Sequence, residues 1–164
     1  LGQRQTGEND IGRGQLLQLG RCFAGTAGFQ GFFDGVGIQV SALARTPLAE
    51  RLAAGLAELK RRPEVDPGRV AAIGYCFGGA TVFQMSYVGT DALGVVSFHG
   101  AMPAAPEESK GKISPRILVL QGYADDWVGP DIVANFRQEL DAAGTDRERN
   151  SYGGVCHGFT NPDA

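Results

Sequence analysis

Apolar and polar residues alternate in blocks over most of the chain. Short runs that are almost continuously apolar predict buried strands, and apolar residues spaced three or four apart predict helices. The expected strands cover residues 70–75, 93–98, 117–120 and, more weakly, 147–152, and the expected helices cover residues 46–62, 77–87 and 130–143. Strands that are apolar throughout and that alternate with helices predict a parallel sheet with helices on both faces, an α/β three-layer sandwich.

The first expected helix separates two parts of the chain. Thr46 suits the N-cap and Pro47 the first helical position. Four leucines on one side of this helix are expected to lie on the sheet: Leu48, Leu52, Leu56 and Leu59. Residues 1–45 are rich in Gly, Gln and Arg, and their pattern predicts an irregular lead-in with a short strand or hairpin near residues 29–40. We therefore expect a lead-in over 1–45 and a partial α/β domain over 46–164.

Composition and charge exclude several classes of function. A net charge of −3 provides no electrostatic basis for binding nucleic acid or an anionic membrane, and no apolar run approaches membrane-spanning length. Three cysteines, at positions 22, 76 and 156, are an odd number that argues against a disulfide scaffold. Their spacing matches no zinc motif. These features predict a cytoplasmic protein without a metal or cofactor, and a first residue other than Met suggests a fragment.

The hexapeptide over residues 74–79 is the strongest chemical signal. It lies between an apolar strand and a helix, with Cys76 at the corner and Gly74 and Gly78 two residues to either side. This is the pattern of a nucleophile elbow, in which a side chain at either flanking glycine would collide with the crossing backbone. The helix N-terminus beneath would favour the thiolate form of Cys76. The alternative interpretation is a buried cysteine in a glycine-rich turn.

Candidate catalytic residues follow three of the four expected strands, in the order Cys76, Asp125 and His157. Parallel strands place their carboxyl ends at one edge of the sheet, where ligands bind. A nucleophile, an acid and a histidine in this order are typical of α/β-hydrolases. Asp126 competes for the acid role, but Asp125 is preferred because it comes first after the strand. Asp126 is expected to cap the turn before the helix at Pro130.

Further residues are candidates for the walls of the site. The backbone N–H of Phe77 is expected to donate to the oxyanion that forms during acyl transfer. Side chains expected to line a substrate pocket, each with core or rim packing as the alternative, are Tyr123, Trp127 and Phe159. His99 is a further candidate for the acyl pocket, and its alternative is a histidine at a strand end that bonds to nearby backbone. Cys156 is expected to be a bystander next to His157.

From residue 65 onward the sequence resembles the dienelactone hydrolase family of α/β-hydrolases. The segments that carry the resemblance are residues 65–79, 95–100, 117–122, 125–128, 152–154 and 157–162, with cysteine in the elbow followed by Phe-Gly-Gly. The resemblance implies a Cys76–His157–Asp125 triad and hydrolysis of lactones or related esters of small carboxylated molecules. It also implies that neither a metal nor an organic cofactor takes part.

The chain departs from this family pattern at both ends. The family has further strands before the matched region, one of whose loops supplies a second oxyanion donor, and a closing helix after the histidine. Residues 161–163 are Asn-Pro-Asp where the founding enzymes have a substrate-binding arginine, which argues against their narrow specificity.

Three functions are therefore compared. The first is a cysteine hydrolase of small esters or lactones, and the second is a catalytically impaired remnant or interaction domain of the same fold. The third is a thiol redox protein that pairs Cys76 with Cys156, although the sequence has no Cys-x-x-Cys motif. The oligomeric state is not predicted.

Overall fold

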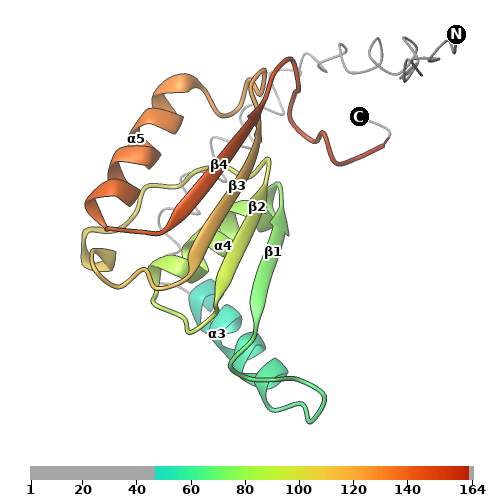
Figure 1. The fold of residues 1–164 in the computed structure, drawn as a ribbon, viewed down its shortest axis with the longest axis vertical. Coiled ribbons are helices and arrows are strands. Elements are labelled where there is room, and N and C mark those ends of the chain that lie inside the picture. The colour runs from blue at the N-terminus through green and yellow to red at the C-terminus, as the bar shows by residue number, and fades with distance from the viewer. Residues whose placement is uncertain (1–46, 163–164) are drawn as a thin grey trace, which may run out of the picture.

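The computed structural model describes residues 47–162, which form a sheet and the helices packed around it (Figure 1). The elements are α3 (Pro47–Lys60), β1 (Ala71–Tyr75), α4 (Phe77–Tyr87), β2 (Gly94–Phe98), the 3-10 helix η2 (Glu107–Ser109), β3 (Arg116–Gly122), α5 (Pro130–Ala142) and β4 (Arg147–Tyr152). Each predicted strand and helix of this part is present, and its ends either coincide with the prediction or differ from it by one or two residues. The predicted strand or hairpin near residues 29–40 lies outside the described residues.

The four strands form one parallel sheet in the order β1-β2-β3-β4. Tyr75 pairs with Phe98, and Phe98 with Leu120, so the strands end at nearly the same level. The segments that follow β1, β3 and β4 therefore leave the sheet at one edge, as the alternating pattern predicts.

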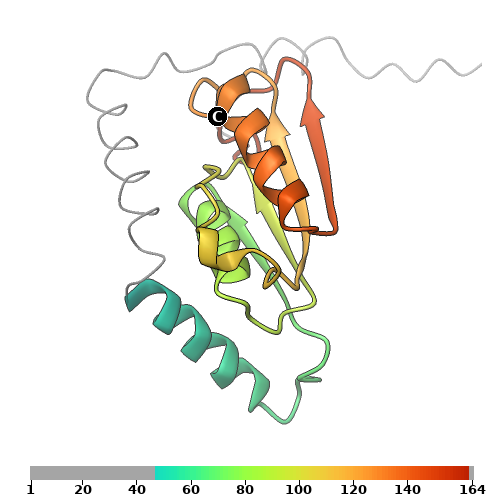
Figure 2. The same ribbon diagram turned by 90° about the vertical axis from the view of Figure 1, so that its left-hand side faces the viewer.

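The core lies between the sheet and two helices on one of its faces. Inward residues of β2 and β3, such as Val95 and Ile117, pack with Phe83 of α4 and with Phe136 and Leu140 of α5. The rings of Phe83 and Phe136 lie 4.8 Å apart between their centroids, so both helices cover the same face (Figures 1 and 2). Their burial anchors the sheet through apolar contact.

The opposite face of the sheet carries no helix in the described part of the chain (Figure 1). Ile73 and Tyr75 of β1 expose 62% and 52% of their surfaces there, and Leu93 before β2 exposes 57%. These strands are apolar on both sides, which is the pattern of a sheet that is covered twice. The described residues thus supply one of the two predicted helical layers.

Helix α3 departs from the expected packing. It contacts α4 rather than lying on the sheet, and Figure 2 shows it at the lower left, below α4. Leu48, Leu52 and Leu56 are half-buried, whereas Leu59 is 44% exposed. The leucine stripe indicated a helix with one buried side, but such a stripe does not specify which element it packs against. No helix of the described residues has the length and apolarity needed to span a membrane.

Candidate active site

Cys76 occupies the turn between β1 and α4 in a strained conformation. Its φ of 52° and ψ of −116° lie outside the regions that non-glycine residues favour, and it is the N-cap of α4. A Cβ on Gly74 would lie 2.0 Å from the carbonyl oxygen of Gly78, so the first glycine of the elbow is required. The expectation for Gly78 is wrong, because a Cβ there would meet no neighbouring atom within 4 Å.

Asp125 lies in the turn after β3 with its carboxylate buried. Its Oδ1 accepts a hydrogen bond from the Trp127 backbone N–H at 3.0 Å, and its Oδ2 accepts one from Gln121 Nε2 at 2.5 Å. Asp126 points into solvent and does not cap α5, whose N-cap is Gly129 without a side-chain bond. The expected capping role of Asp126 is therefore wrong, since Asp125 itself binds the turn.

The loop after β4 brings His157 over the same edge of the sheet. The backbone N–H groups of Tyr123 and Ala124 donate to the carbonyls of Tyr152 and Val155, each at 2.9 Å, which ties this loop to the end of β3. A Cβ on Gly122 would lie 2.3 Å from the Val155 oxygen. Only glycine permits the loop to cross so close to β3.

The three predicted side chains form one continuous chain of contacts. Nε2 of His157 lies 3.3 Å from Sγ of Cys76, and Nδ1 lies 3.0 Å from Oδ2 of Asp125. The His157 side chain keeps 16% of its surface exposed, and Cys76 is half-buried. Sulfur, imidazole and carboxylate thus meet at an edge that remains open to solvent. This geometry permits proton transfer between the sulfur and the imidazole.

These contacts change the charge states of the pair. The hydrogen bond from His157, assisted by His99 and the Phe77 backbone N–H, lowers the pKa of Cys76 to about 6 against an opposing effect of burial. Burial by itself would lower the pKa of His157, but hydrogen bonds to Asp125 and Cys76 raise it to about 9. At neutral pH the pair is therefore a thiolate beside an imidazolium.

His99, which follows β2, lies behind this pair. It is only 4% exposed and, with Cys76, is one of the two non-glycine residues of positive φ in the described part of the chain. Its Nε2 lies 2.8 Å from Thr160 Oγ1, and its ring meets that of His157 edge-on at 4.9 Å between centroids. One nitrogen of each histidine and the Cys76 sulfur all lie within 4.8 Å of one another. His99 thus belongs to the polar centre of the site.

The predicted aromatic wall is partly assembled. The Trp127 ring lies 3.9 Å from the His157 ring between centroids, and Phe159 lies edge-on to His99 at 5.3 Å. Tyr123 is 80% exposed, so a pocket role for this residue stays a prediction.

Two polar residues of the site are absent from the sequence-based expectations. Gln121 orients the Asp125 carboxylate, and Thr160 binds His99. A glutamine at an inward position of an apolar strand is a usable signal, because a buried amide needs a polar partner. Nothing local distinguishes Thr160 from other loop threonines.

The cysteines also differ from the expected pattern. Cys76 is a free thiol, whereas Cys156 forms a disulfide, which the odd cysteine count did not lead us to expect. The pairing of Cys76 with Cys156 that a redox function would require is therefore contradicted.

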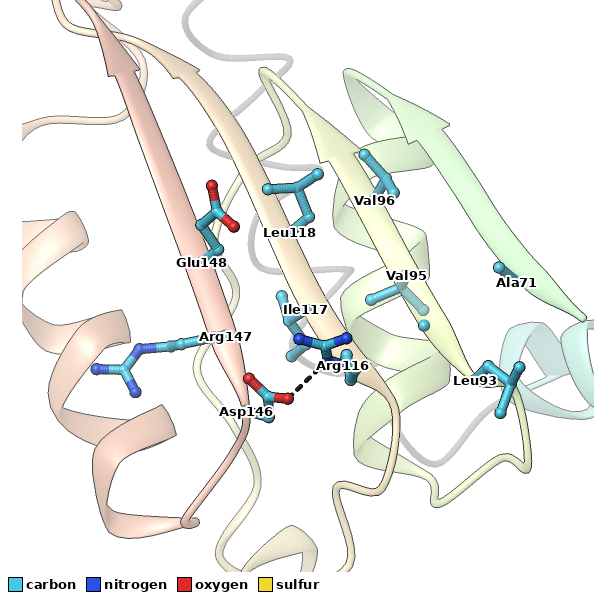
Figure 3. A pocket seen from close by; sticks show the side chains of 11 residues that line it. Ala71, Leu93, Val95, Val96, Arg116, Ile117, Leu118, Asp146, Arg147 and Glu148 are labelled. Carbon is cyan, nitrogen blue, oxygen red and sulfur yellow. Dashed lines mark hydrogen bonds and ion pairs between the residues drawn. The ribbon is translucent and has the colours of Figure 1, made fainter. Parts of the chain in front are cut away.

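A hollow of about 590 Å³ lies elsewhere, on the uncovered face of the sheet. Figure 3 shows Arg116, Leu118 and Glu148 on the near side of the strands, with α4 and α5 behind them. None of the residues that line it belongs to the Cys76 site. The hollow has apolar strand residues at its floor and no cluster of groups suited to acyl transfer.

Comparison with known proteins gives consistent results. The model of the dienelactone hydrolase family matches residues 38–164. An uncharacterized protein of Caenorhabditis elegans is 34% identical over 121 residues, which are 71% of this chain and 75% of the relative.

Solved structures of this family superpose on the described fold. A dienelactone hydrolase-like promiscuous phosphotriesterase from metagenomic libraries aligns with a TM-score of 0.68 at 33% identity, over 70% of this chain and 48% of its own. The structure named m3DLH aligns with a TM-score of 0.67 at 32% identity, over 82% and 53%. A putative dienelactone hydrolase from Klebsiella pneumoniae, at 23% identity and a TM-score of 0.60, supports the fold alone. The chain spans about half the length of these structures.

Proposed function

Because this chain belongs to the dienelactone hydrolase family, we propose that it hydrolyses ester or lactone bonds of small molecules through a Cys76–His157–Asp125 triad. The observation that carries the proposal is the unbroken series of contacts from Sγ of Cys76 through both ring nitrogens of His157 to Oδ2 of Asp125. If Cys76 were only a bystander, its function would not require His157 to be oriented towards it. Nor would it require the buried carboxylate of Asp125 to bind the far side of the His157 ring.

In the first half of the reaction, the Cys76 thiolate attacks the carbonyl carbon of the substrate. The imidazolium of His157 then gives its Nε2 proton to the leaving oxygen, and an acyl-thioester remains on the sulfur. In the second half, neutral His157 takes a proton from water, and the resulting hydroxide attacks the thioester. The tetrahedral intermediate then breaks its carbon–sulfur bond and releases the acid. This leaves the Cys76 thiolate beside a His157 imidazolium that keeps the proton taken from water.

The surrounding groups assist these reaction steps in different ways. Asp125 holds the Nδ1–H of His157 and stabilises the imidazolium, and its own carboxylate is fixed by Gln121 and the Trp127 N–H. The Phe77 N–H at the start of α4 is the proposed oxyanion donor. Loss of one such donor typically slows acyl transfer by about 100- to 1,000-fold.

The test is turnover of p-nitrophenyl acetate by the full chain. We expect hydrolysis that is lost in Cys76→Ala and after treatment with iodoacetamide, while Asp126→Asn, a change at an exposed carboxylate one residue from the triad, retains activity. A phosphate triester belongs in the same assay, because one similar enzyme is described as a promiscuous phosphotriesterase. Turnover that survives Cys76→Ala would contradict the proposed nucleophile.

The second candidate is an interaction domain of the same fold. It is favoured by the exposed apolar residues Ile73, Tyr75 and Leu93 on the uncovered face of the sheet. This candidate predicts that the protein lacks esterase activity while it remains folded. Iodoacetamide reactivity of Cys76 without any turnover would support it over the enzyme.

A further inference from the structure

We propose that Cys76, His99 and His157 form a binding site for Zn²⁺, which would hold the protein in a reversibly blocked state. The three residues follow β1, β2 and β4, and their sequence positions show no zinc motif. The sheet nevertheless brings one sulfur and two imidazole nitrogens within 4.8 Å of one another. Thiolate and imidazole are the ligands that Zn²⁺ prefers in proteins.

The distances suit a small adjustment around one ion. Bonds of about 2.3 Å to sulfur and about 2.0–2.1 Å to nitrogen place tetrahedral donors roughly 3.3–3.6 Å apart. The Cys76 sulfur and the nearer His157 nitrogen are already 3.3 Å apart. The donor atom of His99 lies within 4.8 Å of these two atoms. A rotation of the side chains would bring it into the coordination sphere. Because Cys76 and His157 are partly exposed, solvent reaches this group of atoms.

Hydrogen bonds behind the donors also match those of a zinc site. Asp125 binds the remote nitrogen of His157, which is the carboxylate–histidine arrangement that orients zinc ligands. Thr160 binds Nε2 of His99, while the buried Nδ1 of His99 has no hydrogen-bond partner among the described residues. An unpartnered nitrogen in a buried ring calls for an explanation, and a metal ion would satisfy it.

Three protein ligands leave a fourth position for water. The bound ion would occupy the sulfur that attacks the substrate and the nitrogen that moves the proton, so hydrolysis would stop until the metal is removed. This consequence rests on the proposed function, whereas binding of the ion itself does not. The site would thus make the enzyme sensitive to free zinc.

The direct test is a titration of metal-free, untagged protein with Co²⁺, whose spectrum reports its ligands. We expect one ion per chain, a thiolate-to-metal charge-transfer band, visible bands of tetrahedral coordination, and displacement by Zn²⁺. Cys76→Ser should remove the charge-transfer band. His99→Gln should weaken binding by at least about tenfold, as expected for a lost ligand in view of the 10- to 100-fold cost of second-shell changes.

A second pair of variants covers the case in which His99→Gln does not fold. Thr160→Val removes only the hydroxyl that orients His99 and should weaken binding by about tenfold. Thr90→Val is the matched control, because its hydroxyl bonds a backbone carbonyl elsewhere. Equal Co²⁺ affinity in wild type, His99→Gln and Thr160→Val would overturn the proposal, as would a protein that binds no Co²⁺.

The same samples separate this inference from the proposed hydrolase. An inactive metal-free protein that shows the tetrahedral Co²⁺ spectrum, with loss in His99→Gln, would refute the enzyme and support the metal site. An active protein whose p-nitrophenyl acetate turnover is unaffected by Zn²⁺ would refute the metal site and support the enzyme.

Discussion

Replacement of His157 by Gln tests whether the imidazole controls the reactivity of Cys76. Glutamine has similar length and polarity, but it neither carries a positive charge nor titrates. The imidazole is the largest of the influences that lower the pKa of Cys76 from its ordinary value of 9.0 to about 6. Its removal should therefore move this pKa back towards 9.

The size of the effect on reactivity follows from two opposing terms. At pH 7 a thiol with a pKa of about 6 is about nine-tenths thiolate, and one with a pKa of 9.0 is about one-hundredth thiolate, a difference of about 90-fold. A more basic thiolate is also a better nucleophile, and a Brønsted coefficient of about 0.4–0.5 over three units returns about 16- to 32-fold. The alkylation rate at pH 7 should thus fall only about three- to sixfold.

The midpoint of the pH profile is consequently a better measure than the rate. Alkylation by iodoacetamide is followed on the Cys76 peptide by mass spectrometry from pH 5 to pH 10, with a chelator present. We expect a midpoint near 6 in wild type and a shift of up to about three units in His157→Gln. Three units is the upper limit, because His99 and the Phe77 N–H, which also lower this pKa, remain in the variant.

Tyr123→Phe is the control, since this ring is 80% exposed, and its midpoint should equal that of wild type. A wild-type midpoint near 9, or the same midpoint in His157→Gln and wild type, would refute the thiolate–imidazolium pair. That result would also refute the proposed attack by a preformed thiolate.

Three other changes have defined outcomes. Asp125→Asn should lower kcat for p-nitrophenyl acetate by about a thousandfold or more, because the amide favours the wrong imidazole tautomer, whereas Asp126→Asn should change it less than twofold. Gly122→Ala places a methyl group 2.3 Å from a backbone carbonyl and should cost about 2 kcal/mol or more of unfolding free energy in urea, while Gly129→Ala, with no atom within 4 Å of the added carbon, should be nearly neutral. The pH dependence of stability should be nearly flat for the thiol–imidazole pair between about 6.5 and 9, as read from thermal unfolding midpoints. The raised pKa of His157 contributes stability that is lost as the pH rises from 6.5 through 9, whereas the lowered pKa of Cys76 contributes stability that is gained over almost the same range. A strong net slope would show that only one of the two pKa shifts exists.

The strands and helices could be predicted because their signals are local. Pro130 begins α5, and Gly144 with a φ of 66° follows its end, as the start and stop residues indicate. The partner of α3 could not be predicted, since Leu48, Leu52 and Leu56 specify a buried side but not the element that buries it. Packing partners depend on three-dimensional arrangement rather than on period.

Part of the candidate site could be predicted from the sequence for a related reason. Cys76, Asp125 and His157 each lie in the segment that follows a strand, and the topology of a parallel sheet then brings these segments to one edge. Gln121 and Thr160 act through another side chain, and such contacts leave no spacing in the sequence. His99 could equally have lined the pocket or stood beside the thiolate. These two roles differ only in where its ring points, which the sequence does not reveal.

The strained residues Cys76 and His99 show how the sheet holds the site. The N–H of Cys76 donates to the Phe98 carbonyl at 3.1 Å, and the N–H of His99 donates to the Leu120 carbonyl at 2.8 Å. The interstrand ladder therefore continues one residue beyond β1 and β2, into the two positions where φ is positive. Adjacent strands lie about 4.7–4.9 Å apart, and this spacing carries over to the side chains that follow them. The sheet thus opposes the cost of the strained conformations and sets the distance between sulfur and imidazole, so hydrolysis and metal binding would depend on the same register.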